Sequence, residues 1–255
     1  HKYVNIVDVG VGNGLAVKEL LRYFHTGGRL KKYIGIDISQ TLLDITSQNI
    51  TEWFSGKINI TKIQKDITSS SFRAETFQSE DSIVNIFVFA GGTIMNIRDP
   101  AQVIKMLRDS MGKSDILITT QKLDHANARR FFDFNIESDT SILPLHDTYV
   151  LELMNIKEAY YDVEQYYDSN DRSRYIKVRF KVALTIQFDI RGHTKSIEFE
   201  KGDSITLLRV LHFTFEETLK LYSKNGFNII QATKSLDEEF IFLAAKVESK
   251  KSEAF

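Results

Sequence analysis

The 255-residue sequence has no cysteine, only two prolines and no apolar run near the roughly 20 residues that span a bilayer. Without cysteine, a disulfide framework, a thiolate metal site and a cysteine nucleophile are excluded. The start lacks a basic segment followed by an apolar one, so we expect no secretory signal and a cytoplasmic location. A strand-like segment begins almost at once, so His1 is either a tag remnant or the cut end of a longer protein.

A charge excess of either sign is also missing. The formal net charge is -1 and the pI is about 6.7, whereas nucleic-acid-binding domains show a basic stripe or a pI above roughly 9. The richest basic cluster, Arg29–Lys32, is short. We therefore expect neither nucleic acid nor a membrane as a partner. The histidines are scattered without the paired spacing of metal ligands, so no metal site is expected.

The first 120 residues alternate between strand-like and helix-like segments. Hydrophobic residues make up 42% of the chain and charged residues 26%, which is typical of a globular protein with one core or a core plus a cap. Helix starts are indicated by Ser39 and by Asp99-Pro100. Five βα units in series predict a doubly wound parallel sheet. Its expected strands are Val4–Val9, Tyr33–Asp37, Ile58–Gln64, Ile83–Ala90 and Asp115–Thr119.

The chain changes character after about Lys122. Up to Tyr167 it is polar and aromatic, and we expect helix. From Tyr175 to Ile190 apolar residues alternate strictly, and Arg191–Thr194 turns the chain back, which predicts one long amphipathic hairpin. We expect the apolar stripe of this hairpin to pack on helices. If the stripe were exposed, it would be a homodimer interface.

The C-terminal part returns to the first pattern. Phe213–Lys224 predicts a helix ending at Gly226, followed by apolar strands at Phe227–Ala232 and Phe240–Ala245. The predicted fold is therefore α/β, a doubly wound, mostly parallel seven-stranded sheet closed by an antiparallel hairpin and carrying an inserted α+β cap. The expected divisions are 1–121 (core, first part), 122–211 (inserted cap), 212–247 (closing core) and 248–255 (tail).

A glycine-rich loop follows the first strand. Asp8 stands two residues before Gly10, and Gly12 and Gly14 follow as a helix opens. Glycines there let the backbone pass close to a ligand, and a helix start offers free N–H groups. Dinucleotide-binding folds use a similar loop. A carboxylate inside the strand end favours a cationic ligand over a pyrophosphate.

Two further acids end the next two strands. Asp37 can accept hydrogen bonds from both hydroxyls of a ribose, and Asp66 can reach an adenine amino group. With Asp8, three acids at successive strand ends converge on one adenosine-sized ligand. The alternative reading is that these acids are only helix caps and turn formers.

These segments resemble a known enzyme family. The Asp8–Gly14 loop, the Tyr33–Asp37 strand and Lys65-Asp66-Ile67 are similar to class I S-adenosylmethionine (SAM)-dependent methyltransferases. Phe89–Asn96 resembles the Gly-Ser-Thr-Ile-Gly-Asn segment of the histidine Nα-methyltransferases of ergothioneine biosynthesis, a family that includes fungal methyltransferases of a prenylated tryptophan. The resemblance implies SAM as the cofactor. It implies donor contacts at Asp8, Gly10, Gly12, Gly14, Asp37, Ile38, Asp66, Ile67, Ala90 and Gly91.

The same resemblance carries over only in part to the acceptor. It implies that Asn96 holds the amine and carboxylate of an amino acid, while the family's carboxylate-binding tyrosine falls near Phe132, which has no hydroxyl. The family's imidazole-reading glutamate and serine fall near Leu208–Leu211, which is apolar. Unpaired polar atoms of an imidazole would cost about 1–3 kcal/mol each there. We therefore expect a small-molecule amine, such as a hydrophobic or aromatic amino acid, rather than histidine.

Methyl transfer to an amine requires the nitrogen to be neutral, so a base or water must take its proton. The candidates in the predicted cap are His146, Asp147, Tyr149 and Tyr160, although for each of them a surface or packing role is favoured over a catalytic one. Two other functions stay open: a methyltransferase of protein or RNA, and an inert relative that acts as a binding partner.

Overall fold

The computed structural model describes residues 2–76, 82–124, 145–190 and 192–248. The chain divides into two compact units: residues 1–123 with 214–255, and residues 124–213 between them. The second unit is thus an insertion in the sequence of the first. In the part of the chain that is described, no helix is long and apolar enough to cross a membrane.

A seven-stranded sheet forms the middle of the first unit. Its strand order is β11-β12-β5-β4-β1-β2-β3, and β12 runs antiparallel to both of its neighbours while the other pairs are parallel. This confirms the predicted doubly wound sheet with a closing antiparallel hairpin. The strands are β1 (Tyr3–Val9), β2 (Leu30–Asp37), β3 (Ile60–Gln64), β4 (Ile83–Ala90), β5 (Ile116–Lys122), β11 (Phe227–Lys234) and β12 (Phe240–Val247).

Two helices of this unit begin at the caps that the sequence predicts, and a third begins at a cap found only in the structure. Ser39 accepts a hydrogen bond from the Leu42 N–H, and Asp99 accepts one from Gln102. Thr214 forms a reciprocal capping box with Glu217, and Gly226 follows the last helix at a φ of 86°. The helices are η1 (Leu15–Val17), α1 (Lys18–Thr26), α2 (Gln40–Trp53), α3 (Arg73–Thr76), α4 (Thr93–Asn96), α5 (Pro100–Ser110) and α8 (Phe215–Lys224).

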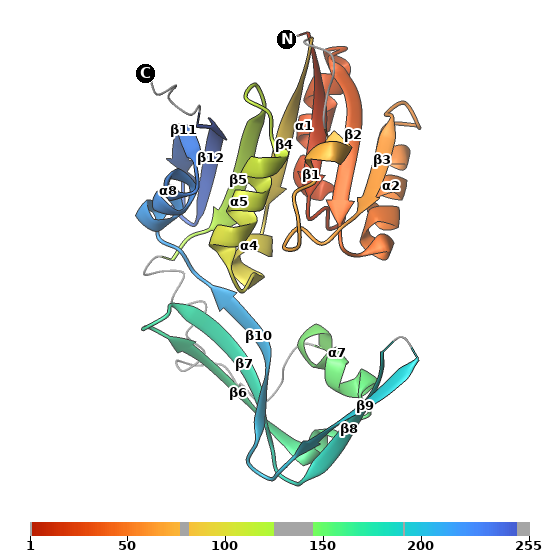
Figure 1. Cartoon of the computed structure of the whole chain (residues 1–255), viewed down its shortest axis with the longest axis vertical. Coiled ribbons are helices and arrows are strands. Elements are labelled where there is room, and N and C mark those ends of the chain that lie inside the picture. Colours follow the sequence, from red (N-terminus) through yellow and green to blue (C-terminus); the bar gives the residue numbers. More distant parts are fainter. Residues whose placement is uncertain (1, 77–81, 125–144, 191, 249–255) are drawn as a thin grey trace, which may run out of the picture. The chain divides into compact units, whose positions relative to one another are not determined.

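Helices cover the sheet on both faces (Figure 1), with α5 and α8 packed on one face and α1 and α2 on the other. Every residue of β4 from Ile83 to Phe89 is therefore buried. This explains why β4 reads as a continuous apolar run rather than an alternating one.

The second unit contains two small antiparallel sheets, one of order β10-β7-β6 and one pairing β8 with β9. A separate apolar cluster includes Leu151, Ile156, Val178 and Phe180, so this unit has its own core. Its elements are α7 (Leu145–Leu153), η2 (Glu158–Tyr160), β6 (Tyr161–Asp168), β7 (Ser173–Phe180), β8 (Leu184–Ile190), β9 (His193–Phe199) and β10 (Ser204–Leu211).

The structure corrects two expectations here. The continuous strand predicted from Tyr175 to Ile190 is wrong, because the chain leaves β7 after Phe180 and β8 begins in another sheet at Leu184. Apolar residues stand at even positions on both sides of the break, so the alternation in the sequence does not reveal it. Val182, which lies between the two strands, is 39% exposed instead of facing inward. β8 and β9 pair antiparallel with Ile190 opposite His193, which agrees with the predicted reversal of the chain.

The helix expected up to Tyr167 is also wrong in its last part. Tyr161–Asp168 is β6, and it pairs along its whole length with β7. The apolar alternation of Tyr161 and Val163 stops at Gln165, and most residues of the strand are only half-buried. Pairing with β7 therefore decides the conformation of this segment.

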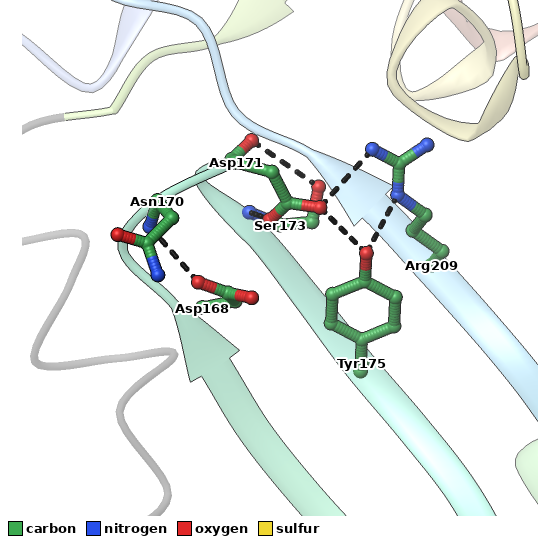
Figure 2. Close-up of polar contacts among 6 residues, drawn as sticks. All are labelled: Asp168, Asn170, Asp171, Ser173, Tyr175 and Arg209. Carbon is green, nitrogen blue, oxygen red and sulfur yellow. Dashed lines mark hydrogen bonds and ion pairs between the residues drawn. The ribbon is translucent and has the colours of Figure 1, made fainter.

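A polar network ties the turn between β6 and β7 to β10 (Figure 2). The Tyr175 hydroxyl donates to Asp171 over 2.6 Å, and Arg209 donates to the same hydroxyl through Nε over 3.1 Å. Arg209 Nη2 also lies 3.2 Å from Asp171 Oδ2. The other carboxylate oxygen of Asp171 accepts from the Ser173 N–H. One carboxylate thus organises the turn and anchors a neighbouring strand.

Candidate functional site

The glycine loop has the backbone that its sequence predicts. Gly10, Gly12 and Gly14 have φ values of 75°, 53° and 79°, where side chains are disfavoured. A Cβ on Gly12 would meet nothing within 4 Å, whereas a Cβ on Gly14 would lie 2.9 Å from Thr46 Cγ2. The backbone at Gly12 is therefore open to a ligand, and Gly14 is required by packing against α2.

Side chains of α2 hold this loop in place. The Thr46 hydroxyl donates to the Gly12 carbonyl over 2.9 Å, and Asn49 Nδ2 donates to the Asn13 carbonyl over 2.9 Å. The Gly10 N–H donates to the Ile36 carbonyl on β2. The loop conformation is thus set by the protein itself, so little ordering remains for ligand binding.

Asp37 and Asp66 end their strands with different surroundings. Asp37 is 8% exposed, and its Oδ1 accepts from the Ser39 N–H over 2.9 Å. Asp66 Oδ1 accepts from the hydroxyl and the N–H of Thr68, and these hydrogen bonds hold the pKa of Asp66 below its ordinary value. Asp66 is therefore a carboxylate at neutral pH, with its second oxygen directed away from this turn's donors.

These elements surround a pocket of about 520 Å³ at the carboxyl ends of β1, β2 and β3. Six residues proposed from the sequence line it: Gly10, Gly12, Asp37, Ile38, Asp66 and Ile67. Sequence reasoning missed five others: Leu42, Lys65, Thr68, Thr93 and Ile97. An apolar residue close to a strand-end acid is the signal that could have found such pocket residues in the sequence. In the structure Ile38 is 65% and Leu42 36% exposed, so both present apolar surface at the pocket. These apolar surfaces suit a flat aromatic ring between polar ends.

Four donor residues suggested by the resemblance are placed elsewhere in this unit. Asp8 is buried and Gly14 contacts α2, so neither lines the pocket. Ala90 ends β4, and Gly91 follows at a φ of 89° with its N–H bonded to the Thr120 carbonyl. Asn96, the suggested substrate residue, is exposed at the end of α4.

Asp8 lies against Tyr33 of β2. The buried Tyr33 hydroxyl donates to Asp8 Oδ2 over 2.8 Å. Burial is the main cause that raises the pKa of Asp8 to about 7; the Tyr33 hydrogen bond opposes this rise, and the charge of the nearby Asp37 adds to it. Asp8 therefore titrates near neutral pH, in contrast to the ordinary carboxylate assumed from the sequence.

The base candidates all fall in the second unit. Tyr149 on α7 is 53% exposed and Tyr160 at the end of η2 is 37% exposed. His146 and Asp147 belong to α7, but their side chains lie outside the described residues, and Phe132 lies outside them entirely. Their roles remain predictions.

The first half of the chain decides the family. Residues 1–132, just over half of the 255, match the family model described as "Histidine-specific methyltransferase, SAM-dependent". The chain belongs to this family. The matched residues include the glycine loop and all three strand-end acids. A comparison with curated proteins gives no match.

Solved structures agree with the fold of this methyltransferase. The PH0226 protein from Pyrococcus horikoshii has a TM-score of 0.54 at 14% identity, covering 97% of this chain and 84% of that one. An SAM-dependent methyltransferase from Methanosarcina mazei has a TM-score of 0.50 at 15% identity, covering 98% and 95%. At these identities the likeness concerns the class I methyltransferase fold alone.

The methyltransferase pocket fits its cofactor, SAM. Asp37 presents a buried carboxylate of the kind that would accept ribose hydroxyls, and the open backbone at Gly12 would let the loop approach the amino-acid part. Ile38 and Leu42 would offer apolar surface to the adenine, and Asp66 would offer an acceptor to its amino group. SAM supplies an activated methyl group on a sulfonium, so the protein's own task is to bind, orient and exclude water.

Proposed function

We propose that this methyltransferase methylates the amine nitrogen of a small molecule, an amino acid or derivative other than histidine. The matched family residues end at 132, so they hold the donor-binding part of the chain together with Asn96 and Phe132. The family's imidazole-reading residues fall beyond them, on β10, where this chain has different residues.

The apolar side chains of Leu208 and Val210 on β10 carry the proposal. Leu208 lies opposite Ile176 of β7 in the antiparallel register, and Leu208 and Val210 are both half-buried. Neither side chain can hydrogen-bond to an imidazole. Because each unpaired polar atom costs about 1–3 kcal/mol, histidine would bind here at least about tenfold more weakly than an apolar amino acid.

The overall charge supports a small acceptor over nucleic acid. A net charge of -1 offers little attraction to a phosphate backbone. The acceptor amine must be neutral to react, so its proton must pass to a group of the cap or to water. Tyr149, Tyr160, His146 and Asp147 remain the candidates for that step.

The test is methyl transfer from SAM to a panel of single amines, followed by mass spectrometry. The panel pairs histidine with tryptophan, phenylalanine and tyrosine, and each amino acid with its decarboxylated amine. We expect turnover of an aromatic member and little of histidine. We expect the double variant Leu208→Gln, Val210→Ser to shift the preference toward histidine, with Leu236→Gln, a fully exposed leucine in the first unit, as the matched control.

Other outcomes separate the alternatives. Preferred turnover of histidine by the unaltered chain would contradict the proposal. Turnover only on protein or RNA would favour a macromolecular acceptor. Binding of S-adenosylhomocysteine (SAH) without turnover on any acceptor would favour an inert, partner-binding relative.

A further inference from the structure

Asp8 and Tyr33 form a buried pair beneath the glycine loop. Asp8 is 3% and Tyr33 1% exposed, and their oxygen atoms are 2.8 Å apart. Asp8 stands two residues before Gly10, so its carboxyl group lies at the base of the loop that lines the donor pocket. A buried carboxyl group therefore lies close to the donor pocket without lining it.

The packing around Gly35 keeps Tyr33 in this position. A Cβ on Gly35 would lie 3.2 Å from Tyr33 Cε1, 3.3 Å from its hydroxyl and 3.0 Å from Val11 Cγ1. The Tyr33 ring and the Val11 side chain of the loop thus share the space above Gly35. The ring packs closely over Gly35, and its hydroxyl is directed at Asp8.

Few charged groups face Asp8. From β2 come Tyr33 and Asp37, and Asp37 adds a like charge. The neighbouring strand β4 presents Val88 at the register position of Asp8. The helices on this face contribute the apolar Val17, Leu21 and Ile50 to the same cluster as Tyr33. No cation among these groups compensates a negative charge on Asp8.

We propose that the Asp8–Tyr33 pair couples binding of the cationic methyl donor to the release of one proton from Asp8, with Tyr33 as the positioning residue. In the free protein Asp8 holds a proton at pH 6. When the donor binds, its ammonium favours the ionised form, the O–H bond of the carboxyl breaks, and the proton passes to solvent. The Tyr33 hydroxyl donates to the resulting carboxylate and stabilises it.

Proton linkage fixes the sign of the pH dependence. Donor affinity rises with pH up to a plateau above the Asp8 pKa of about 7, with a limiting slope of tenfold per pH unit below it. Removing the Tyr33 hydroxyl moves this plateau to higher pH, because the carboxylate loses its hydrogen bond. At pH 7 we expect Tyr33→Phe to bind about tenfold more weakly, and the loss to shrink at pH 8.5.

The experiment is calorimetric titration with SAH, which keeps the ammonium of SAM but carries no transferable methyl group. Titrations in buffers of different ionisation enthalpy, from pH 6 to pH 8.5, count the protons released. The matched control is Tyr222→Phe, which removes an equally buried hydroxyl on the opposite face, bonded to Thr119 over 3.1 Å. Asp8→Asn keeps the shape of the side chain but has no carboxyl proton to release. The ligand's own amine is the same in both titrations, so any proton it gains or loses is counted equally for the wild type and for Asp8→Asn.

We expect the wild type and Tyr222→Phe to release close to one proton at pH 6 and little at pH 8.5. Tyr33→Phe should still release a large fraction at pH 8, and Asp8→Asn should release none at any pH. Equal release by the wild type and Asp8→Asn would overturn the proposal, as would the same midpoint for Tyr33→Phe and Tyr222→Phe. If Tyr33→Phe does not fold, the comparison of wild type with Asp8→Asn still decides the matter.

Discussion

The hydroxyl of Thr46 on α2 donates a 2.9 Å hydrogen bond to the carbonyl oxygen of Gly12, and its methyl group lies 2.9 Å from where a Cβ on Gly14 would be. One side chain therefore both orients the glycine loop and limits its sequence. The loop and α2 act as a single preformed support for the donor.

This relationship separates the roles of two glycines. Gly14→Ala should destabilise the protein by more than Gly12→Ala, because both have positive φ but only Gly14 meets Thr46 Cγ2 at 2.9 Å. Strain alone costs about 1 kcal/mol at either position. Urea unfolding measures the difference. Adding Thr46→Ser removes the methyl and keeps the hydroxyl, so it should recover part of the Gly14→Ala loss and none of the Gly12→Ala loss.

Gly12→Ala should show the opposite pattern in binding. Its backbone faces the pocket, so we expect a modest loss of stability but a large loss of SAH affinity. Equal affinity in the wild type and Gly12→Ala, measured by calorimetry, would argue against close backbone approach at this position.

Asp37→Ala should weaken SAH binding by about a hundredfold. The carboxylate is buried beside the pocket and can accept two ribose hydroxyls, each hydrogen bond to a charged group contributing about 1.5 kcal/mol or more. Asp44→Ala, which removes an exposed carboxylate of α2 bonded to Lys62, is the matched control and should bind normally. A similar affinity in both variants would contradict the assignment of Asp37.

Asp8→Asn should stabilise the ligand-free protein at pH 8. The pKa of Asp8 is about 7 in the folded protein against 3.8 for the ordinary group, so the folded state binds more protons between these values. The free energy of unfolding therefore falls as pH rises from about 4 to 7, and the loss persists above 7. We expect the variant to gain on the order of 3 kcal/mol at pH 8. Below about pH 4 the two proteins should differ little, and a pH-independent difference in Tm would refute this expectation.

Asp171→Ala should destabilise the second unit more than Asp168→Ala. Asp171 accepts from Tyr175, Arg209 and the Ser173 N–H, whereas Asp168 in the same turn accepts from the Asn170 N–H. Because the network is partly exposed, we expect a loss of about 1–2 kcal/mol. Amide hydrogen exchange along β7 and β10 would show where this stability is lost. Equal protection of these amides in both variants would count against the network.

The sequence by itself determined the class of fold and the donor loop. Apolar runs with helix caps between them, such as β4 before Asp99-Pro100, specify a parallel sheet through local rules of periodicity and capping. The same local rules place Asp37 and Asp66 at strand ends, and the structure brings both to one pocket. The carboxyl ends of parallel strands lie at one edge of the sheet. The positions of Asp37 and Asp66 at that edge therefore follow from the order of the strands along the chain.

Only the tertiary structure decided features that depend on partners distant in sequence. The break between Phe180 and Leu184 does not disturb the apolar alternation in the sequence. It arises because β7 and β8 pair with different strands. The apolar alternation in β6 stops at Gln165, and the segment forms a strand through its pairing with β7. The titration of Asp8 near pH 7 arises from burial and from Asp37, 29 positions away in the chain. Desolvation is a property of the packed site, so a sequence can name a carboxyl group but cannot tell at which pH it is charged.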